Sequence, residues 1–400
     1  MNFQKLSNNN SYDKDCITLV ACGDIGLYGE LEQKFITEGT YAILNNTLDI
    51  FKEADLIFGN LEGPISELGT PVNPVPFPNL RMHPDCSKFL KEAGFNIINI
   101  SNNHMLDYGK EALLDTIERL NEANIPFIGA GKNSEEAWTP NIIRVKNIKI
   151  GFFGIHEAGA AASHKEPGAS KFEKDLALSS IKKLKQSADI IVVSMHFGFD
   201  YFSIPSPYHI RLCRMLIDEG ADLILGHHPH VPQPFEKYKN GLIVYSLGNF
   251  LFYLGEPATQ ASKEGFLLKV GFTKTGIKKY NFIPYMMNND YFVQILDGEL
   301  GEKKLIEYIK SSLIFNDPQK IRLRWYQNIR NYYLGYIAYY WKKDLKKEKN
   351  FRDFLNQLIR LFNPTMPNRI LIKSLIGYLI TGYLLKNELK KLLSYKKKYI

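Results

Sequence analysis

The stretch Gly220–Pro234, GADLILGHHPHVPQP, carries the pattern that decides the fold. A short apolar run, Ala221–Leu225, is followed at once by a glycine and by His227, His228 and His230. A continuous apolar run of this length is typical of a strand that is buried on both faces. Polar residues directly after such a strand lie at the sheet edge where open α/β proteins bind their ligands. The stretch therefore predicts a buried strand with a binding site at its carboxyl end.

The same pattern recurs through the first 250 residues. Apolar runs that predict buried strands are Ile17–Ala21, Asp55–Phe58, Phe95–Ile100, Ile125–Gly129, Lys149–Ile155, Asp189–Met195, Ala221–Leu225 and Leu242–Ser246. Amphipathic helical patterns separate them at Thr40–Lys52, Asp85–Ala93, Gly109–Ala123, Asp175–Gln186 and Pro207–Glu219. Regular alternation of strands and helices predicts a layered α/β fold with largely parallel strands.

The pattern changes near residue 265. From Gly265 to about Leu296 the residues alternate as in antiparallel strands, and the segment TKTG favours a hairpin turn there. A short helix over Lys303–Leu313 is expected to close the domain. We therefore expect a disordered N-terminus over residues 1–16, a domain over residues 17–318 and a helical, basic and aromatic extension over residues 319–400.

The net charge of +8 belongs to the extension. Residues 321–400 hold 18 Lys and Arg against 4 Asp and Glu, a net of +14, whereas residues 1–320 hold 32 against 38, a net of −6. A basic tail favours an anionic partner such as a membrane leaflet. A solvated helix face is the alternative, and a nucleic acid is disfavoured.

The last apolar stretch of the tail, Ile370–Leu385, is short for a membrane span. Sixteen helical residues reach ~24 Å, whereas the hydrocarbon core is ~30 Å thick. An interfacial helix is thus expected, with a helix packed on the domain as the alternative.

The N-terminal residues and the cysteines indicate the cellular compartment of the protein. The first 16 residues lack the apolar core of a signal peptide. The four cysteines are scattered and form neither a disulfide framework nor a zinc-ribbon spacing. These features predict a cytoplasmic protein, with a peripheral position at the inner membrane face if the tail binds lipid.

Polar residues with metal-binding side chains follow the predicted strands. They are Asp24, Asn60, Glu62, Asn102, Asn103, His104, Asp107, His196, His227, His228, His230 and Asn249. Any one of them alone is typical of a turn or a helix cap. Together they supply carboxylate, amide and imidazole donors without a thiolate, which is the donor set that a two-metal hydrolytic centre uses.

The series of motifs resembles that of the calcineurin-like metallophosphoesterases and, within them, the CapA family named for poly-γ-glutamate capsule synthesis. The resemblance covers roughly Ile17 to Phe252. It rests, in this order, on GDIGL, NLEGPI, NNHMLDYG, HFGFDY, GADLILGHHPHVPQP and YSLGNFLF. It implies a four-layer αββα metallophosphatase-like sandwich that binds one or two divalent ions, with Mn, Fe and Zn all suited to such donors.

The resemblance also implies roles for single residues. It assigns metal binding to Asp24, Asn60, Glu62, Asn103, His196, His228 and His230, with Glu62 ahead of Asn60 as the ligand from their motif. It implies that His104 protonates a leaving group or orients a phosphate and that Asp107 orients His104. Substrate contacts are expected from Asn102, Tyr201, His227 and Asn249, and from Arg81 in a Pro-rich loop.

Two positions depart from the broad superfamily. The superfamily begins with Asp-x-His, whereas this chain has Gly26 in the third position, so one metal ligand is missing. Its second motif is Gly-Asp-x-x-Asp, whereas this chain has Gly59-Asn60-Leu61-Glu62. CapA-type sequences share both changes, which leaves one ion with a weak second one as an alternative to two full sites.

Two functions are compatible with these motifs. The first is a metal-dependent hydrolase that acts on a phosphoester or on an anionic polymer. The second is a non-catalytic, metal-containing accessory protein of a membrane-associated polymer-synthesis assembly. The presence of His104 beside Asn103 favours catalysis, because a binding site needs no general acid. Nucleic-acid processing is disfavoured, because the domain is acidic and no basic residues line the motif loops.

Overall fold

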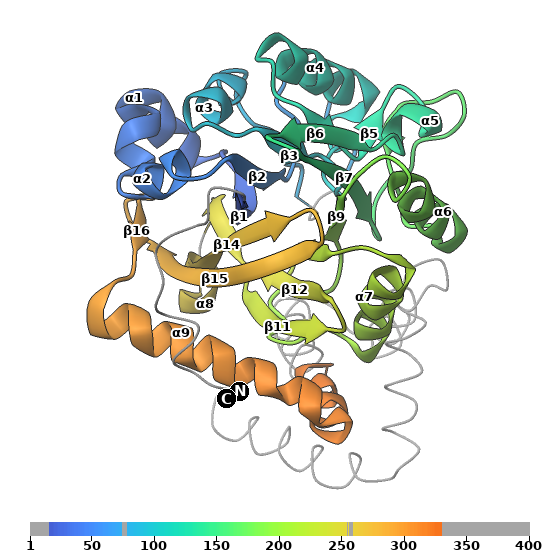
Figure 1. Cartoon of the computed structure of the whole chain (residues 1–400). Helices are drawn as coiled ribbons and strands as arrows, with labels where there is room; N and C mark the ends of the chain where they lie inside the picture. Colours follow the sequence, from blue (N-terminus) through green and yellow to red (C-terminus); the bar gives the residue numbers. More distant parts are fainter. Residues whose placement is uncertain (1–15, 74–77, 254, 256–258, 330–400) are drawn as a thin grey trace, which may run out of the picture. The chain divides into compact units, whose positions relative to one another are not determined.

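The computed structural model of the chain describes residues 16–73, 78–253, 255 and 259–329 (Figure 1). The chain forms two compact units, residues 1–318 and residues 319–400. Only residues 319–329 of the second unit are described, so the predictions for Ile370–Leu385 and the rest of the basic tail lie outside the described residues. The same holds for residues 1–15. Among the described residues, every helix is too short or too polar to cross a bilayer.

Two sheets build the first unit. The first sheet has the order β16-β15-β14-β1-β2-β3-β4, with β13 also paired to β1. Its strands are β1 (Ile17–Gly26), β2 (Leu56–Leu61), β3 (Ile97–Asn99), β4 (Phe127–Ile128), β13 (Asn249–Phe252), β14 (Glu264–Thr273), β15 (Gly276–Met287) and β16 (Val293–Ile295).

The second sheet has the order β11-β12-β10-β9-β7-β6. Its strands are β6 (Asn141–Val145), β7 (Ile148–His156), β9 (Ile190–His196), β10 (Leu223–His227), β11 (Pro232–Tyr238) and β12 (Gly241–Leu247). A small ribbon pairs β5 (Ala130–Gly131) with β8 (Gly168–Ala169). In the first sheet β1, β2, β3 and β4 pair in parallel, whereas β1 with β14, β14 with β15 and β15 with β16 are antiparallel. In the second sheet the central pairs are parallel and the two outer pairs are antiparallel.

The two sheets pack face to face, and helices cover their outer faces (Figure 1). Between the sheets, the rings of Phe58 and Phe152 stack with their centroids 6.2 Å apart. The first sheet is covered by α1 (Glu30–Leu44), α2 (Thr47–Lys52), α3 (Cys86–Glu92) and α4 (Gly109–Glu122). The second sheet is covered by α6 (Lys174–Leu184) and α7 (Pro207–Glu219). The predicted αββα sandwich is confirmed.

Several element boundaries differ from the prediction. The helix predicted over Thr40–Lys52 is two helices, because Asn45 adopts a φ of 41° and breaks the chain direction between α1 and α2. The closing helix α9 (Gly298–Ser312) begins before the predicted Lys303. Short helices α5 (Ser134–Ala137) and α8 (Gln260–Lys263) were not predicted. The hairpin of β14 and β15 was predicted correctly.

The carboxyl ends of the parallel strands in both sheets meet at one edge of the sandwich. There the backbone of β1 approaches the start of β13, and the Asp24 N–H donates to the Gly248 carbonyl at 3.0 Å. A Cβ atom at Gly23 would lie 1.8 Å from that same carbonyl oxygen. Glycine at position 23 therefore permits the close approach that brings the motif residues of the two sheets together.

Replacing a leucine between the sheets tests this packing. Leu225 is fully buried in β10, whereas Leu176 on α6 is 41% exposed. We expect Leu225→Ala to lower the free energy of unfolding by about 3 kcal/mol, because it leaves a cavity between the sheets. Leu176→Ala is the matched control and should cost less than about 1 kcal/mol. Urea denaturation measures both, and equal losses would contradict the described core.

Candidate metal centre

Glu62 lies at the centre of the motif residues. It follows β2 and is completely buried. Its Oε1 lies 3.5 Å from His230 Nε2, 3.6 Å from His196 Nε2 and 3.8 Å from His104 Nε2. These distances are too long for hydrogen bonds, and neither Glu62 oxygen has a hydrogen-bond partner among the described residues. Three imidazole nitrogens thus converge on a buried carboxylate without satisfying it.

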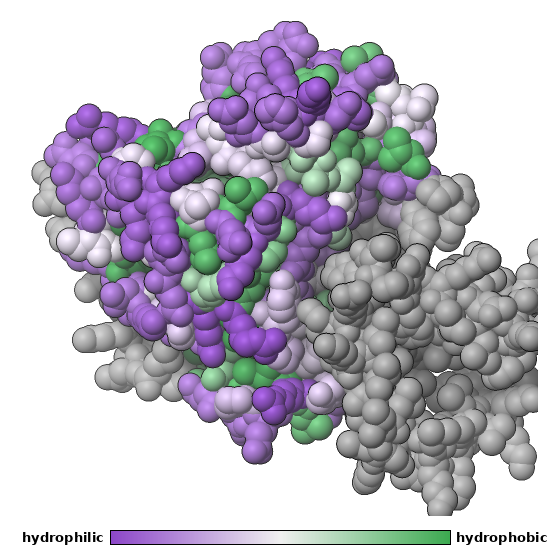
Figure 2. Space-filling view, turned by 90° about the vertical axis from the view of Figure 1, so that its right-hand side faces the viewer, coloured by the Kyte–Doolittle hydropathy of each residue, from purple (hydrophilic) through white to green (hydrophobic). Residues whose placement is uncertain are grey.

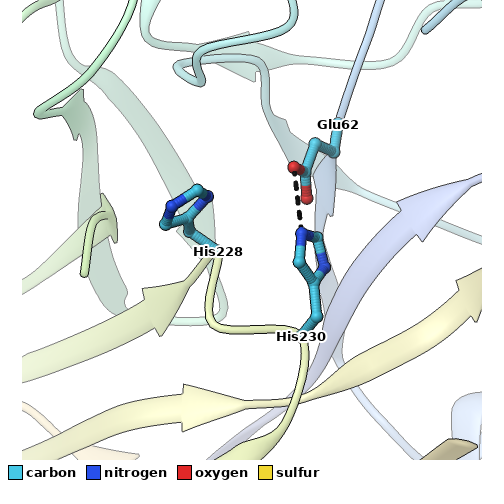
Figure 3. A group of neighbouring side chains, drawn as sticks. All are labelled: Glu62, His228 and His230. Carbon is cyan, nitrogen blue, oxygen red and sulfur yellow. Dashed lines mark ion pairs between the residues drawn. The ribbon is translucent and has the colours of Figure 1, made fainter. Parts of the chain in front are cut away.

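His228 and His230 approach Glu62 from the turn that follows β10, and both rings point toward the space beside its carboxylate (Figure 3). Donor atoms of Glu62, His228 and His230 lie within 4.8 Å of one another, as do those of Asp24, Glu62 and His196. His228 and His230 have φ values of 95° and 57°, a region that non-glycine residues rarely adopt. Backbone strain of this kind is concentrated at functional sites.

Asp24, at the end of β1, is the second buried carboxylate. Its Oδ1 accepts a hydrogen bond from Asn60 Nδ2 at 2.8 Å and lies 3.2 Å from His227 Nδ1. Its Oδ2 accepts the backbone N–H of His228 at 3.1 Å and lies 3.6 Å from His230 Nδ1. Asp24 therefore joins the end of the first sheet to the histidine turn of the second.

Both polar atoms of the Asn60 side-chain amide make hydrogen bonds. Its Nδ2 donates to Asp24, and its Oδ1 accepts from Asn99 Nδ2 at 2.7 Å. Asn99 in turn lies against Gly154, where a Cβ atom would be 2.1 Å from Asn99 Oδ1. These contacts leave Glu62 as the side chain of its motif with free oxygens. Asn99 was not singled out in the sequence, where it reads as an ordinary strand residue.

The two carboxylates differ in acidity. Burial alone would raise the pKa of Asp24, but the hydrogen bond and charge of His227, with the charge of His230, hold that pKa below its usual value. Burial raises the pKa of Glu62 well above its usual value, and the negative charge of Asp24 raises it further. Burial lowers the pKa of His196 and keeps its imidazole neutral, the form that binds metals. A cation beside Glu62 would offset the cost of burying its charge.

His104 and Asp107 form a separate pair at the edge of the centre. His104 Nδ1 lies 2.7 Å from Asp107 Oδ2, and Asp107 also accepts from the Leu80 N–H at 2.7 Å and from Asn73 Nδ2 at 2.8 Å. Because the carboxylate holds the Nδ1 proton, the Nε2 atom is the one that faces Glu62.

Asn102, Asn103 and Asn249 support the histidines. Asn102 Oδ1 accepts the His104 N–H at 3.1 Å, while its Nδ2 donates to the Leu61 carbonyl at 2.7 Å. Asn103 Oδ1 lies 2.7 Å from His196 Nε2. Asn249 Oδ1 lies 2.9 Å from His230 Nδ1, which orients His230 Nε2 toward Glu62.

The residues expected to contact substrate differ in burial and in their neighbours. His227, Asn102 and Asn249 are buried and contact the residues just described. Tyr201 is 55% exposed, and its ring centroid lies 6.1 Å from that of His230. The Arg81 guanidinium lies 4.1 Å from the centre of the Tyr108 ring. Substrate contact stays a prediction for all five residues.

Acidic residues that the sequence did not point to lie beside the histidines. Asp200 Oδ1 is 3.4 Å from His228 Nε2. Glu157 Oε2 lies 2.7 Å from His209 Nε2, and the Glu157 N–H donates to the carbonyl of His196. Both acids occupy loops after strands, where a lone carboxylate has no distinguishing pattern in the sequence.

The glycine at position 26 has a structural reason. A Cβ atom there would lie 2.8 Å from ring atoms of both Phe252 and Tyr28. The Phe252 ring packs on His230 with centroids 4.6 Å apart. Aromatic packing against His230 therefore fills the space that a side chain at position 26 would need, so a histidine ligand cannot be accommodated there without moving these rings.

The chain is similar to known bacterial proteins. The family model described as "Bacterial capsule synthesis protein PGA_cap" matches residues 18–254. The chain is 34% identical to the capsule biosynthesis protein CapA of Bacillus anthracis, over 62% of this chain and 63% of that protein. It is 29% identical to the PGA biosynthesis protein CapA of Bacillus subtilis, over 74% of this chain and 78% of that one. The chain thus spans less than two thirds of the first relative's length.

A solved structure gives a weaker match. The 5'-nucleotidase of Candida albicans is 12% identical, with a TM-score of 0.41 over 76% of this chain and 59% of that one.

Metal addition tests the donor cluster. We expect Mn²⁺ or Zn²⁺ to raise the melting temperature of the metal-stripped protein, because an ion at about 100 times its Kd adds about 2.7 kcal/mol of stability. His228→Ala/His230→Ala should abolish both this rise and the metal found by elemental analysis. His83→Ala/His164→Ala is the matched control and should retain both. Equal responses of the two double variants would contradict the site.

Proposed function

The chain belongs to the family of bacterial capsule synthesis proteins of the PGA_cap type, and we propose that it is a metal-dependent hydrolase. Its substrate would be a phosphoester or an anionic polymer. The observation that carries the proposal is the buried Glu62 carboxylate, which three imidazoles approach and no described residue hydrogen-bonds. Such a carboxylate is costly to bury unless a cation accompanies it.

The donor set fits one or two divalent ions. Glu62, His228 and His230 would hold one ion, and Asp24, Glu62 and His196 would hold a second, with Glu62 shared between them. Asn103 adds an amide oxygen next to His196. These are oxygen and nitrogen donors that suit Mn, Fe or Zn. When bound, the ion would act as a Lewis acid toward an oxygen of the substrate.

His104 and Asp107 supply the proton chemistry in this proposal. Asp107 holds the Nδ1 proton of His104 and fixes the ring, so a protonated His104 presents its second proton at Nε2. This proton faces the side of Glu62 where a substrate would bind. The same pair speaks against a purely non-catalytic accessory role, because metal binding alone requires neither a general acid nor a carboxylate to orient it.

Variants of the pair test catalysis. We expect His104→Gln to lower kcat by about 10²- to 10⁴-fold and Asp107→Asn by about 10- to 100-fold, with metal content unchanged. Turnover of a phosphodiester with an alkyl leaving group should fall more than turnover of a p-nitrophenyl diester, because p-nitrophenolate leaves without a proton. Steady-state kinetics on both esters, together with release of glutamate from polyglutamate, measures the effect.

An exposed carboxylate on α2 serves as the control. Asp49→Asn changes a carboxylate whose side chain is 77% exposed, and it should leave kcat unchanged. If both esters lost the same factor in His104→Gln, the general-acid role would be wrong. If the metal-loaded wild type cleaved none of these substrates, the accessory function would replace the hydrolase.

A further inference from the structure

The Asp107 carboxylate, which orients His104, is itself held by the loop between β2 and α3. Polar and charged side chains cover most of the coloured surface in Figure 2, where water can solvate them. Asp107 is instead only 2% exposed, so its oxygens depend on donors from the protein. Its Oδ2 accepts the Leu80 N–H at 2.7 Å and lies 2.7 Å from His104 Nδ1. Among the described residues, Asn73 Nδ2 is the one donor to its Oδ1, at 2.8 Å.

The side-chain amide of Asn73 has a fixed orientation. Its Nδ2 also donates to the Pro78 carbonyl at 3.0 Å, so both of its protons are used. If the amide were turned over, its oxygen would face the Asp107 carboxylate and the Pro78 carbonyl, which are both acceptors. The surrounding hydrogen bonds therefore identify the group that faces Asp107 as a donor.

The backbone of Asn73 is anchored separately from its side chain. The Asn73 N–H donates to Asn79 Oδ1 at 2.9 Å, and Asn79 Nδ2 donates to the Asn73 carbonyl at 3.0 Å. A Cβ atom at Gly69 would lie 1.8 Å from the Tyr108 carbonyl oxygen, so the glycine permits the loop to lie directly on the turn after Asp107. The main chain thus places Asn73 beside Asp107, and its side chain is left to bind the carboxylate.

These bonds fix which oxygen of Asp107 faces His104. Turning the carboxylate about its Cβ–Cγ bond would break the bonds from both Asn73 and Leu80, because the two donors bind different oxygens. A fixed Oδ2 holds the His104 proton on Nδ1 and leaves Nε2 directed at Glu62, 3.8 Å away. We infer that Asn73 is a positioning residue for the His104–Asp107 pair. Its expected effect on catalysis rests on the proposed function, whereas its effect on the His104 proton does not.

Exchange of the His104 Nδ1 proton with water tests this inference on the full-length protein without turnover. Histidine is labelled with ¹⁵N, Zn²⁺ is added, and side-chain N–H signals are recorded by NMR at one fixed pH. The His104 signal is the one that is lost in His104→Gln. We expect exchange to be about tenfold faster in Asn73→Ala, because a hydrogen bond to a charged group contributes about that factor. Asn73→Asp should speed exchange at least as much, since it keeps the shape of the side chain but replaces the donor by a second carboxylate.

Kinetics on the alkyl phosphodiester and a matched control complete the test. Asn73→Ala should lower kcat about tenfold and change KM by less than about twofold. It should cost nothing further in the His104→Gln background, because both residues act through one group. Ser66→Ala is the control: it removes two hydrogen bonds of the same loop, to Asp115 Oδ2 and from the Leu68 N–H. It should change proton exchange and kcat by less than about twofold.

Three results would overturn the inference. The first is unchanged proton exchange in Asn73→Ala. The second is an equal effect of Asn73→Ala and Ser66→Ala, which would indicate general loosening of the loop. The third is slower exchange in Asn73→Asp than in Asn73→Ala, which would show that the shape of the side chain matters and its donor does not. If the metal-loaded wild type cleaves no ester, the proposed function fails, and the exchange rates alone decide whether Asn73 positions His104. The melting temperature of each variant shows whether it is folded.

Discussion

Burial of two carboxylates at one edge of the sandwich is the constraint on which the site depends. Asp24 and Glu62 are both fully buried, and they come from neighbouring strands of the same sheet. Two charges this close cannot both remain ionised in a protein interior without compensation. The second sheet supplies that compensation for Asp24 through His227, His230 and the N–H of His228. Glu62 receives no such hydrogen bonds from the described residues, and this difference is the basis for proposing a cation beside it.

The backbone is shaped to bring these groups together. The glycine at position 23 lets β1 approach the turn before β13, and the histidine turn adopts strained φ values at His228 and His230. A ring of amides then fixes the side chains, because Asn60, Asn99 and Asn249 each hydrogen-bond a neighbour in or beside the centre. Hydrogen bonds of this kind fix the orientation of metal-binding side chains in proteins.

The sequence allowed the fold to be predicted because buried parallel strands leave long apolar runs. The strands that carry the motifs were found within a few residues, since each run ends directly before a polar residue. The edge strands β6 and β11 were missed because their side chains alternate or vary in burial and so lack a continuous run. The break at Asn45 was missed although asparagine adopts positive φ more readily than most residues, because the apolar residues on both sides fit one continuous helical pattern.

The candidate site was only partly predictable for a similar reason. Donor types and strand ends were readable in the sequence, but the hydrogen bonds that distinguish Asn60 from Glu62 depend on Asn99, on a third strand. The pairing of Asp200 with His228, and the filling of the space at Gly26 by Tyr28 and Phe252, are likewise contacts between distant segments.

The distribution of charge is a further property that the sequence alone does not reveal. Net charge, counted along the chain, drew attention to residues 321–400 and made the domain look uniformly acidic. Strand register instead brings Arg144 opposite Lys149, and the turn between β14 and β15 adds Lys274, so a local excess of positive charge arises from segments that are far apart in sequence. At each end of the sandwich, the residues that directly precede or follow its parallel strands thus lie close together. At the carboxyl ends these are carboxylate, amide and imidazole side chains, and at the amino ends of β7 and β9 they include Lys149 and Asp189.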